Sequence, residues 1–260
     1  MNNKKILVTH LYAGDPSKEF SLKLAETLLD SGADILEVGI PYTDPVCDGE
    51  VFQRVCKRAI EHGITPFDVL HGIKKLRQAG YMQPIYLTSY YGPIFKIGIK
   101  QFVEKAKDAG IQGLIVPDLL LEEQEELSFA CKQNGLSIIQ FATVYSNVFR
   151  LKKIINASSD FIYCISLPGV TGDKLEKDKL HKLLKLLKLL TEKKIYVGFG
   201  IKTARDVKEM ISYGADGVIV GSAIAKVYEK YINEPSRSLH EIKLFMHTLK
   251  TSTIMKGKNT

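Results

Sequence analysis

Four cysteines and the lack of a long apolar run are the clearest shortages of this sequence. The cysteines, at positions 47, 56, 131 and 164, form no Cys-x-x-Cys pair, so neither a disulfide framework nor a cysteine-bound metal is indicated. Nowhere do about 18 apolar residues follow one another, and the first residues lack the apolar segment of a signal peptide. We therefore expect free thiols in a cytoplasmic protein.

The charge balance is only moderately basic. Lys and Arg number 36 against 29 Asp and Glu, which gives a formal net charge of +7. The lysines are spread along the chain without interleaved aromatic residues, a pattern that does not favour nucleic acid and suits a small anionic substrate as well. In the densest run, 179–194, lysines alternate with leucines. A membrane-surface or calmodulin-target helix could have this pattern, but the flanking apolar strands favour an outer helix of a barrel.

Short apolar segments alternate with helical patterns along all 260 residues. A small residue followed by glycine closes several helices, as at Ala109-Gly110. Asp15 and Pro16 are expected to be the N-cap and the first residue of a helix that runs to about Ser31. The eight strands are expected at 6–11, from 34 onward, and at 84–89, 113–116, 136–142, 161–165, 195–198 and 217–220.

This alternation predicts a parallel sheet, because each crossover helix returns the chain to the same edge of the sheet. Eight such units close into a barrel, and the length of the chain suits one domain. The expected fold is therefore α/β, a single (β/α)8 TIM barrel over 1–260 with extra short helices in the loops after strands 2 and 8. Residues from about 248 to 260 are expected to form a polar carboxyl-terminal tail.

A carboxylate interrupts the second strand, where Glu37 lies among apolar residues. A lone ionised glutamate is costly in a strand core unless it is paired, hydrated or kept for chemistry with a raised pKa. The loop after it carries Asp44 and Asp48, so Glu37 and Asp48 are candidates for facing each other across a pocket. The alternative is that Glu37 forms a salt bridge at the strand end and that the two aspartates only form turns.

In eight-stranded barrels the chemistry lies where strands end and helices begin. Glycine-rich loops follow the last three strands, at 168–172, 198–201 and 221–223. Backbone N–H groups of Gly200, Gly221 and Ser222, with a helix N-terminus after strand eight, could bind phosphate without Lys or Arg. Each loop alone could instead be a tight turn. Other residues at strand ends are His10, Tyr12, Asp15, Ser89, Tyr90, Tyr91, Asp118, Thr143 and Tyr163.

Within the stretch 34–53, residues 36–45 read Leu-Glu-Val-Gly-Ile-Pro-Tyr-Thr-Asp-Pro, and Asp48-Gly49 and Gln53 follow. This stretch resembles the signature of tryptophan synthase α chains. Matching motifs recur in order from 13–16 (Ala-Gly-Asp-Pro) to 221–224 (Gly-Ser-Ala-Ile), so the resemblance covers nearly the whole chain. It implies that Glu37 is the catalytic glutamate and that Asp48 hydrogen-bonds the indole N–H. It also implies substrate contacts at Tyr163, Tyr90, Gly172, Phe199, Gly200, Gly221 and Ser222.

The reaction implied by the resemblance is retro-aldol cleavage of indole-3-glycerol phosphate to indole and glyceraldehyde 3-phosphate, in tryptophan biosynthesis. Glu37 would exchange protons with indole C3 and the side-chain hydroxyl, and ionised Asp48 would stabilise the cationic ring. Burial should raise the pKa of Glu37, while an open loop should keep that of Asp48 lower. A Schiff-base aldolase would need a lysine at a strand end, and none is found there. No His or Asp cluster has metal-ligand spacing either, so we expect no cofactor.

The resemblance also implies a β-subunit partner, in an α2β2 tetramer. Gly92, Leu120 and Glu50 replace the family's usual Asn, Pro and Pro at the surface used for that partner. His10 and Tyr12 replace residues that are usually apolar or small near the indole. The alternatives are a standalone indole-3-glycerol phosphate lyase, a barrel that isomerises another phosphosugar, and a non-catalytic ligand-binding barrel that activates a partner.

Overall fold

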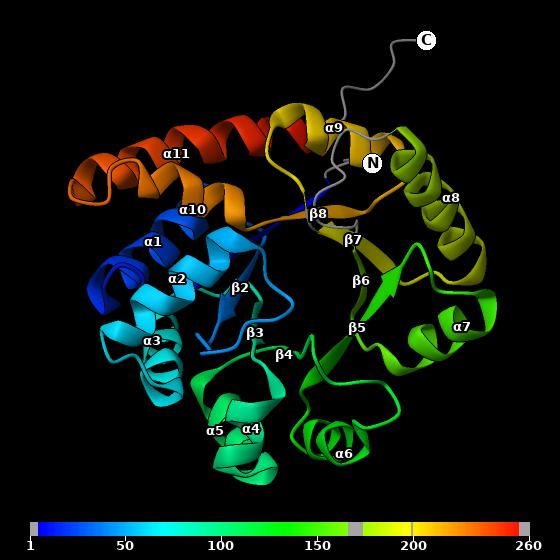
Figure 1. The fold of residues 1–260 in the computed structure, drawn as a ribbon, viewed down its shortest axis with the longest axis horizontal. Coiled ribbons are helices and arrows are strands. Elements are labelled where there is room, and N and C mark those ends of the chain that lie inside the picture. Colours follow the sequence, from blue (N-terminus) through cyan, green and yellow to red (C-terminus); the bar gives the residue numbers. More distant parts are fainter. Residues whose placement is uncertain (1–4, 166–173, 199, 255–260) are drawn as a thin grey trace.

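The protein is described by a computed structural model over residues 5–165, 174–198 and 200–254, with only the backbone for 174–176. Eight parallel strands form a closed barrel in sequence order, β1 to β8, and the helices form a ring outside it (Figure 1). The α/β barrel predicted from the sequence is therefore confirmed. The strands are β1 (Ile6–Tyr12), β2 (Ile35–Gly39), β3 (Ile85–Thr88), β4 (Gly113–Ile115), β5 (Ser137–Thr143), β6 (Phe161–Ile165), β7 (Lys194–Gly198) and β8 (Gly217–Val220).

Two helices instead of one follow β2, β3 and β8. The extra helices expected after the second and eighth strands are α2, which has 12 residues and is longer than expected, and α10. The additional helix after β3, α4, was not expected. The helices are α1 (Lys18–Asp30), α2 (Glu50–Glu61), α3 (Pro66–Gln78), α4 (Tyr91–Ile97), α5 (Ile99–Ala109), α6 (Glu125–Gln133), α7 (Val148–Ala157), α8 (Lys174–Leu190), α9 (Ala204–Ser212), α10 (Ser222–Glu229) and α11 (Pro235–Ser252).

Side chains of each strand point alternately into the barrel and outward to the helices. The outward set, which includes Leu7, Leu36 and Leu87, packs against the helices in one large core. Because Glu37 lies two residues after Ile35, which belongs to the interior, its carboxyl group also points into the barrel. The interior cluster consists of Val8, Ile35, Tyr86, Ile115, Ile139, Phe161, Tyr163, Tyr196 and Ile219.

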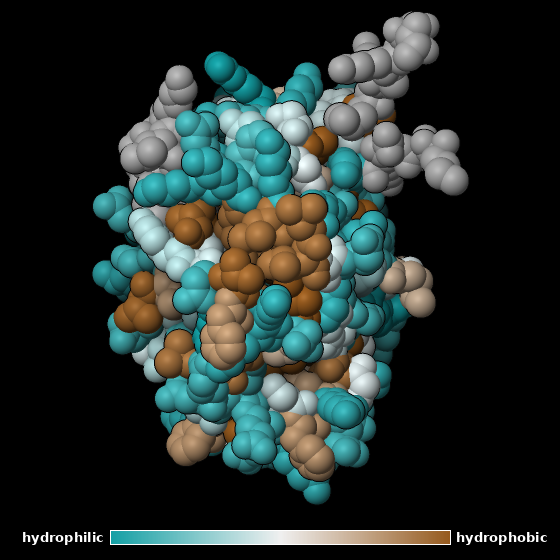
Figure 2. Space-filling view, turned by 90° about the vertical axis from the view of Figure 1, so that its right-hand side faces the viewer, coloured by the Kyte–Doolittle hydropathy of each residue, from teal (hydrophilic) through white to brown (hydrophobic). Residues whose placement is uncertain are grey.

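Helix α8 contains most of the lysine- and leucine-rich run and lies on the outside of the barrel (Figure 1). Its leucines at 180, 183, 184 and 187 are buried, which confirms the outer-helix interpretation. Figure 2 looks onto the side that carries α7 and α8, and it shows a largely hydrophilic surface with a large apolar patch near its centre and smaller apolar areas elsewhere. None of the described helices is long and apolar enough to cross a membrane.

The start of α1 differs from the prediction. Ser17, not Asp15, caps the helix, and its hydroxyl oxygen accepts a hydrogen bond from the Phe20 N–H at 3.0 Å. Pro16 precedes the cap and follows a cis peptide bond. The Asp15 side chain is fully buried, where it accepts hydrogen bonds from the Arg58 guanidinium at 2.7 and 2.9 Å and from the Tyr228 hydroxyl at 2.5 Å. A buried charge needs such partners, and they hold Asp15 away from the helix end.

The carboxyl-terminal end also differs. Residues 248–252, which we expected to begin a polar tail, form the last turn of α11. Leu249 in that turn is fully buried, and Met246 and Ile242 are buried on the same face one and two turns earlier. This spacing is that of an amphipathic helix packed on the barrel, so the helix continues past the point where the sequence becomes polar.

Candidate active site

A cavity of about 580 Å³ opens at the carboxyl ends of the barrel strands. Every strand except β7 contributes a residue of its own, and the loop after β7 contributes Gly200. Residues that line it include His10, Tyr12, Glu37, Asp48, Phe52, Thr88, Tyr90, Ile115, Phe141, Tyr163, Gly200, Ile201, Lys202, Ile219, Gly221, Ser222 and Lys226. The cavity is therefore placed where barrels of this kind carry their chemistry.

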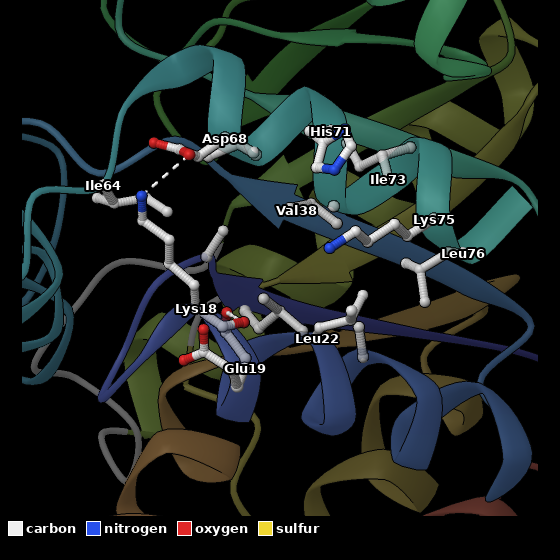
Figure 3. A pocket seen from close by; sticks show the side chains of 16 residues that line it. Lys18, Glu19, Leu22, Val38, Ile64, Asp68, His71, Ile73, Lys75 and Leu76 are labelled. Carbon is white, nitrogen blue, oxygen red and sulfur yellow. Dashed lines mark hydrogen bonds and ion pairs between the residues drawn. The ribbon is translucent and has the colours of Figure 1, made fainter.

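A smaller cavity of about 230 Å³ lies outside the barrel between α1 and α3 (Figure 3). Its walls are largely apolar, and the Lys18 ammonium pairs with the Asp68 carboxylate at 2.9 Å beside it. Val38 lines this cavity, whereas its neighbour Glu37 lines the central one. The two cavities thus lie on opposite faces of the same strand, and only the central one contains the predicted carboxylate pair.

Glu37 is buried, with an exposed fraction of 2%. Its Oε1 accepts a hydrogen bond from the Thr88 hydroxyl at 2.5 Å and lies 3.3 Å from Nδ1 of His10. Its Oε2 is buried without a partner among the described residues. Burial raises the pKa of Glu37 to about 7, although the Thr88 hydrogen bond lowers it in part. The expected raised pKa is thus found, and Glu37 can exchange a proton near neutral pH.

Asp48 lies at the start of α2 in a loop that is less open than expected. The backbone of this loop is fixed by hydrogen bonds from the Asp48 N–H to the Pro45 carbonyl at 3.0 Å and from the Gln53 amide to the Asp48 carbonyl at 2.8 Å. Asp44 in the same loop is exposed, and its carbonyl accepts from the Val46 N–H at 2.9 Å, as a turn former does.

Two tyrosine hydroxyls hold the Asp48 side chain. Those of Tyr12 and Tyr90 donate to the same carboxylate oxygen, Oδ2, at 2.6 and 2.8 Å. Burial raises the pKa of Asp48, contrary to the picture of an open loop, whereas the hydrogen bond from Tyr12, the nearby His10 and the hydrogen bond from Tyr90 lower it. The phenols therefore offset a desolvation that the loop sequence alone did not show.

Tyr163 is buried at an interior position of β6 and contacts the Phe141 ring at a centroid distance of 5.0 Å. Gly198 on the neighbouring strand makes room for it, because a Cβ there would lie 2.5 Å from the tyrosine ring. Burial, with the charges of Glu37 and Asp48, raises the pKa of the Tyr163 hydroxyl well above its usual value. Tyr163 is therefore a neutral phenol beside the two carboxyl groups.

The loops after β7 and β8 meet at the same cavity. Gly200 adopts a left-handed φ of 82°, and Gly221 is the N-cap of α10, where a Cβ would lie 2.7 Å from the Phe52 ring. Ser222 is the first residue of α10, so its N–H is one of those that a helix leaves without a partner within the helix. Gly172 and Phe199, which were also predicted to contact the substrate, lie outside the described residues.

Several residues that line the cavity were not singled out from the sequence. Thr88 could have been found, because a polar residue near the end of an apolar strand is as unusual as Glu37. Lys226 lies four residues after Ser222 on the same helix face, so its position on the cavity wall follows from helical spacing. Lys202 and Phe52 come from loop and helix positions for which the sequence has no comparable signal.

The comparisons with known proteins point to one family. The sequence model of the family described as "Tryptophan synthase alpha chain" matches residues 1–254. The chain belongs to the tryptophan synthase alpha chain family. It is 40% identical to the tryptophan synthase alpha chain of Halalkalibacterium halodurans over 260 residues, 97% of each chain, and 35% identical to that of Arabidopsis thaliana over 96% of this chain and 91% of the other.

Solved structures agree with this assignment to the tryptophan synthase alpha chain family. The alpha subunit from Legionella pneumophila has a TM-score of 0.89 at 30% identity, with 97% of this chain and 98% of the other covered. A chain of the tryptophan synthase complex from Pyrococcus furiosus has a TM-score of 0.85 at 29% identity, with 96% and 99% covered. The resemblance seen in the sequence motifs is thereby confirmed, and the family implies a lyase.

Proposed function

We propose that this chain cleaves indole-3-glycerol phosphate to indole and glyceraldehyde 3-phosphate by a retro-aldol reaction, as the α chain of tryptophan synthase. The observation that carries the proposal is the carboxylate pair in one cavity, with Glu37 able to exchange a proton near neutral pH and Asp48 held by two phenols. Family membership supports the same reaction.

The reaction needs two proton transfers, one from Glu37 to the substrate and one from the substrate to Glu37. Protonated Glu37 gives its proton to indole C3, which leaves a cation delocalised to the ring nitrogen. The carboxylate then takes the proton of the side-chain hydroxyl, the bond from C3 to the hydroxyl-bearing carbon breaks, and that carbon becomes the aldehyde. The electron pair of the broken bond restores the neutral indole ring. Glu37 ends protonated, so the cycle balances without an added acid or base.

Asp48 acts on the positive charge. An ionised carboxylate near the ring N–H stabilises the cation more than the neutral substrate, which lowers the barrier and not only the binding free energy. Oδ2 of Asp48 already accepts two hydrogen bonds, so its other oxygen remains for the ring N–H. Tyr163 and Phe141 supply the apolar wall that a flat ring requires.

The phosphate group fits the far side of the cavity. Backbone N–H groups near Gly200 and Ser222 and the positive end of α10 favour an anion there. Lys202 and Lys226 line the same region, which the sequence-based proposal of a purely backbone site did not include. These two lysines place positive charge, part of the net charge of +7, beside the region proposed for the phosphate group of the substrate.

A β-subunit partner belongs to the same proposal. Solved relatives include tryptophan synthase complexes, such as that of Pyrococcus furiosus. Of the replaced residues, Leu120 is 58% exposed, and Gly92 lies close to Tyr42, since a Cβ at Gly92 would lie 2.8 Å from the Tyr42 hydroxyl. Leu120 thus leaves an apolar side chain exposed in the loop after β4.

The test is to supply indole-3-glycerol phosphate and measure indole and glyceraldehyde 3-phosphate separately. The proposal expects both products in equal amounts, with faster turnover when a β subunit is added. Equal products with high turnover and no response to the β subunit would indicate the standalone lyase. Absence of both products, with ligand binding intact, would favour the non-catalytic barrel and overturn the proposed reaction.

A further inference from the structure

Three neighbouring strands bring His10, Glu37 and Thr88 together inside the barrel. His10 on β1 pairs in register with Glu37 on β2, and Thr88 on β3 pairs with Gly39, two residues further along β2. All three side chains are buried, with exposed fractions of 7%, 2% and 5% for the residues in that order. Polar side chains at this depth are retained only with partners or for a task.

The His10 ring is fixed by its surroundings. It lies between the rings of Tyr12 and Phe52, at centroid distances of 5.0 and 4.9 Å. Two glycines keep the space for this packing. A Cβ at Gly39 would lie 3.0 Å from Nε2 of His10 and 2.4 Å from the Tyr12 ring, and a Cβ at Gly221 would lie 3.2 Å from the His10 Cβ. The ring is therefore closely packed, with its Nδ1 3.3 Å from Oε1 of Glu37.

His10 is a neutral imidazole in this setting. Burial lowers its pKa to about 4, and the charge of Asp48 offsets only part of the effect. A neutral imidazole carries one hydrogen, and the acceptor that faces the ring indicates which nitrogen holds it. A hydrogen on Nδ1 makes His10 a donor to Oε1 of Glu37, whereas a bare Nδ1 would place two acceptors 3.3 Å apart when Glu37 is ionised. The donor arrangement leaves an unpaired lone pair on Nε2, which costs less than an unpaired N–H.

We propose that neutral His10 and Thr88 are positioning residues that both donate to Oε1 of Glu37 and thereby reserve Oε2 for the proton that moves to and from the substrate. The inference rests on the proposed retro-aldol function. With Oε1 already accepting from Thr88 at 2.5 Å and facing His10, a proton on that oxygen would displace a donor. Oε2 has no partner among the described residues, so the transferable proton is located there.

The two donors also set how firmly Glu37 holds its proton. Titratable groups that face it from other elements are His10, the Asp48 carboxylate and the Tyr163 phenol. Of these, Asp48 disfavours a second negative charge and Tyr163 is neutral, so the hydrogen bonds to Oε1 are what stabilise ionised Glu37. Removing either donor should make Glu37 a weaker acid.

The experiment compares two pairs of substitutions. His10→Phe and Thr88→Val remove a donor, while His10→Asn and Thr88→Ser keep an N–H or O–H that can reach Oε1. The matched control is Thr9→Val, because Thr9 is buried on the same strand and its hydroxyl has no partner among the described residues. Thr9→Val replaces the same hydroxyl by a methyl group as Thr88→Val does. Thr9 is the residue before His10 on β1, and its side chain makes no hydrogen bond to Glu37.

Two readouts are measured for each variant. The first is the protonation of the Glu37 carboxyl group by infrared difference spectroscopy across pH, referenced to Glu37→Gln, which needs no turnover. The second is kcat for indole release across pH. We expect His10→Phe and Thr88→Val to raise the midpoint of the carboxyl titration by about one unit, as loss of a hydrogen bond to a charged group does. The alkaline fall in kcat should move by the same amount.

The conservative variants and the control separate positioning from packing. His10→Asn and Thr88→Ser should return the titration midpoint toward that of the unchanged protein, and Thr9→Val should leave it in place. Equal midpoints in all variants would overturn the inference, as would a shift of the same size in Thr9→Val. If the unchanged protein releases no indole, the proposed function fails, yet the infrared titration still decides whether the donors act on Glu37.

Discussion

The hydroxyl of Tyr12, the last residue of β1, donates to Oδ2 of Asp48 at 2.6 Å. Tyr90 donates to the same oxygen at 2.8 Å and also accepts a hydrogen bond from the Cys47 N–H at 2.9 Å. Each carboxylate of the site thus has its own pair of neighbours, phenols at Asp48 and the Thr88 and His10 side chains at Glu37. The environments of Glu37 and Asp48 therefore differ in the groups that can stabilise the ionised carboxylate.

Removing a phenol donor should make Asp48 harder to ionise. In Tyr12→Phe the carboxylate loses a hydrogen bond that lowers its pKa, so that pKa rises further above its usual value. Ionised Asp48 is lost as the pH falls through its pKa, and the acid fall in kcat should therefore move upward by about one unit. The measurement is kcat across pH for Tyr12→Phe, Tyr90→Phe and the double variant, which should shift most. Acid limbs that coincide with that of the unchanged protein would contradict this role.

Lys226 should contribute to binding of the anionic substrate. It is exposed on α10, so the effect is screened by solvent, and Lys226→Gln should raise KM for indole-3-glycerol phosphate about three- to tenfold with little change in kcat. Raising the salt concentration should reduce the difference between the variant and the unchanged protein. Lys230→Gln removes the same charge just after the end of the helix and is the control. If both variants raise KM equally, net charge and not position is responsible.

The stability of the fold should depend on the Glu37 charge. Its pKa is raised from 4.5 to about 7, so the folded protein binds more protons than the unfolded chain between these values. Stability is then lost as the pH rises from about 4.5 to 7, by up to about 3 kcal/mol. Glu37→Gln should lack this loss. Urea unfolding at pH 5 and pH 8 should show the variant gaining free energy of unfolding relative to the unchanged protein at pH 8. A constant difference between the two pH values would argue against a protonated buried Glu37.

A complex with a β subunit should form despite the altered rim. Sedimentation of the mixed chains should show a defined heteromeric species, and indole release should accelerate on mixing. Leu120 is exposed at the rim, so Leu120→Asp should weaken the complex by introducing charge at an apolar contact. Phe129→Asp, at another exposed apolar residue, on the outer helix α6, is the control. If the two chains sediment separately after mixing, the standalone lyase is favoured.

The sequence predicted the barrel well because its signals are local. Alternating apolar strands and glycine-closed helices place all eight strands within a few residues of their observed bounds. Glu37 was also found from its own strand, since a charge among apolar residues is conspicuous. Asp15 was misplaced because its partners Arg58 and Tyr228 are distant in sequence, and no local pattern distinguishes a buried aspartate from a helix cap.

The environment of Asp48 could not be predicted for the same reason. Its loop contains prolines and glycine, which indicate an exposed turn, but Tyr12 on β1 and Tyr90, the N-cap of α4, donate to its side chain. The contacts of Thr88 and His10 with Glu37 depend on the register of the barrel, which pairs His10 with Glu37 only once the strands lie side by side. Local sequence patterns therefore identify Glu37 and Asp48, whereas contacts between distant parts of the chain determine the pKa values of their side chains.

The most direct test of the role of Glu37 compares the unchanged protein with Glu37→Gln. The quantity measured is the rate of indole formation from saturating indole-3-glycerol phosphate. Glutamine keeps the shape of the side chain but cannot pass a proton to C3 and take one from the hydroxyl. The account predicts a fall in kcat of at least about a thousandfold with KM nearly unchanged. A Glu37→Gln variant that releases indole at a rate close to that of the unchanged protein would contradict the assignment of Glu37 and the mechanism built on it.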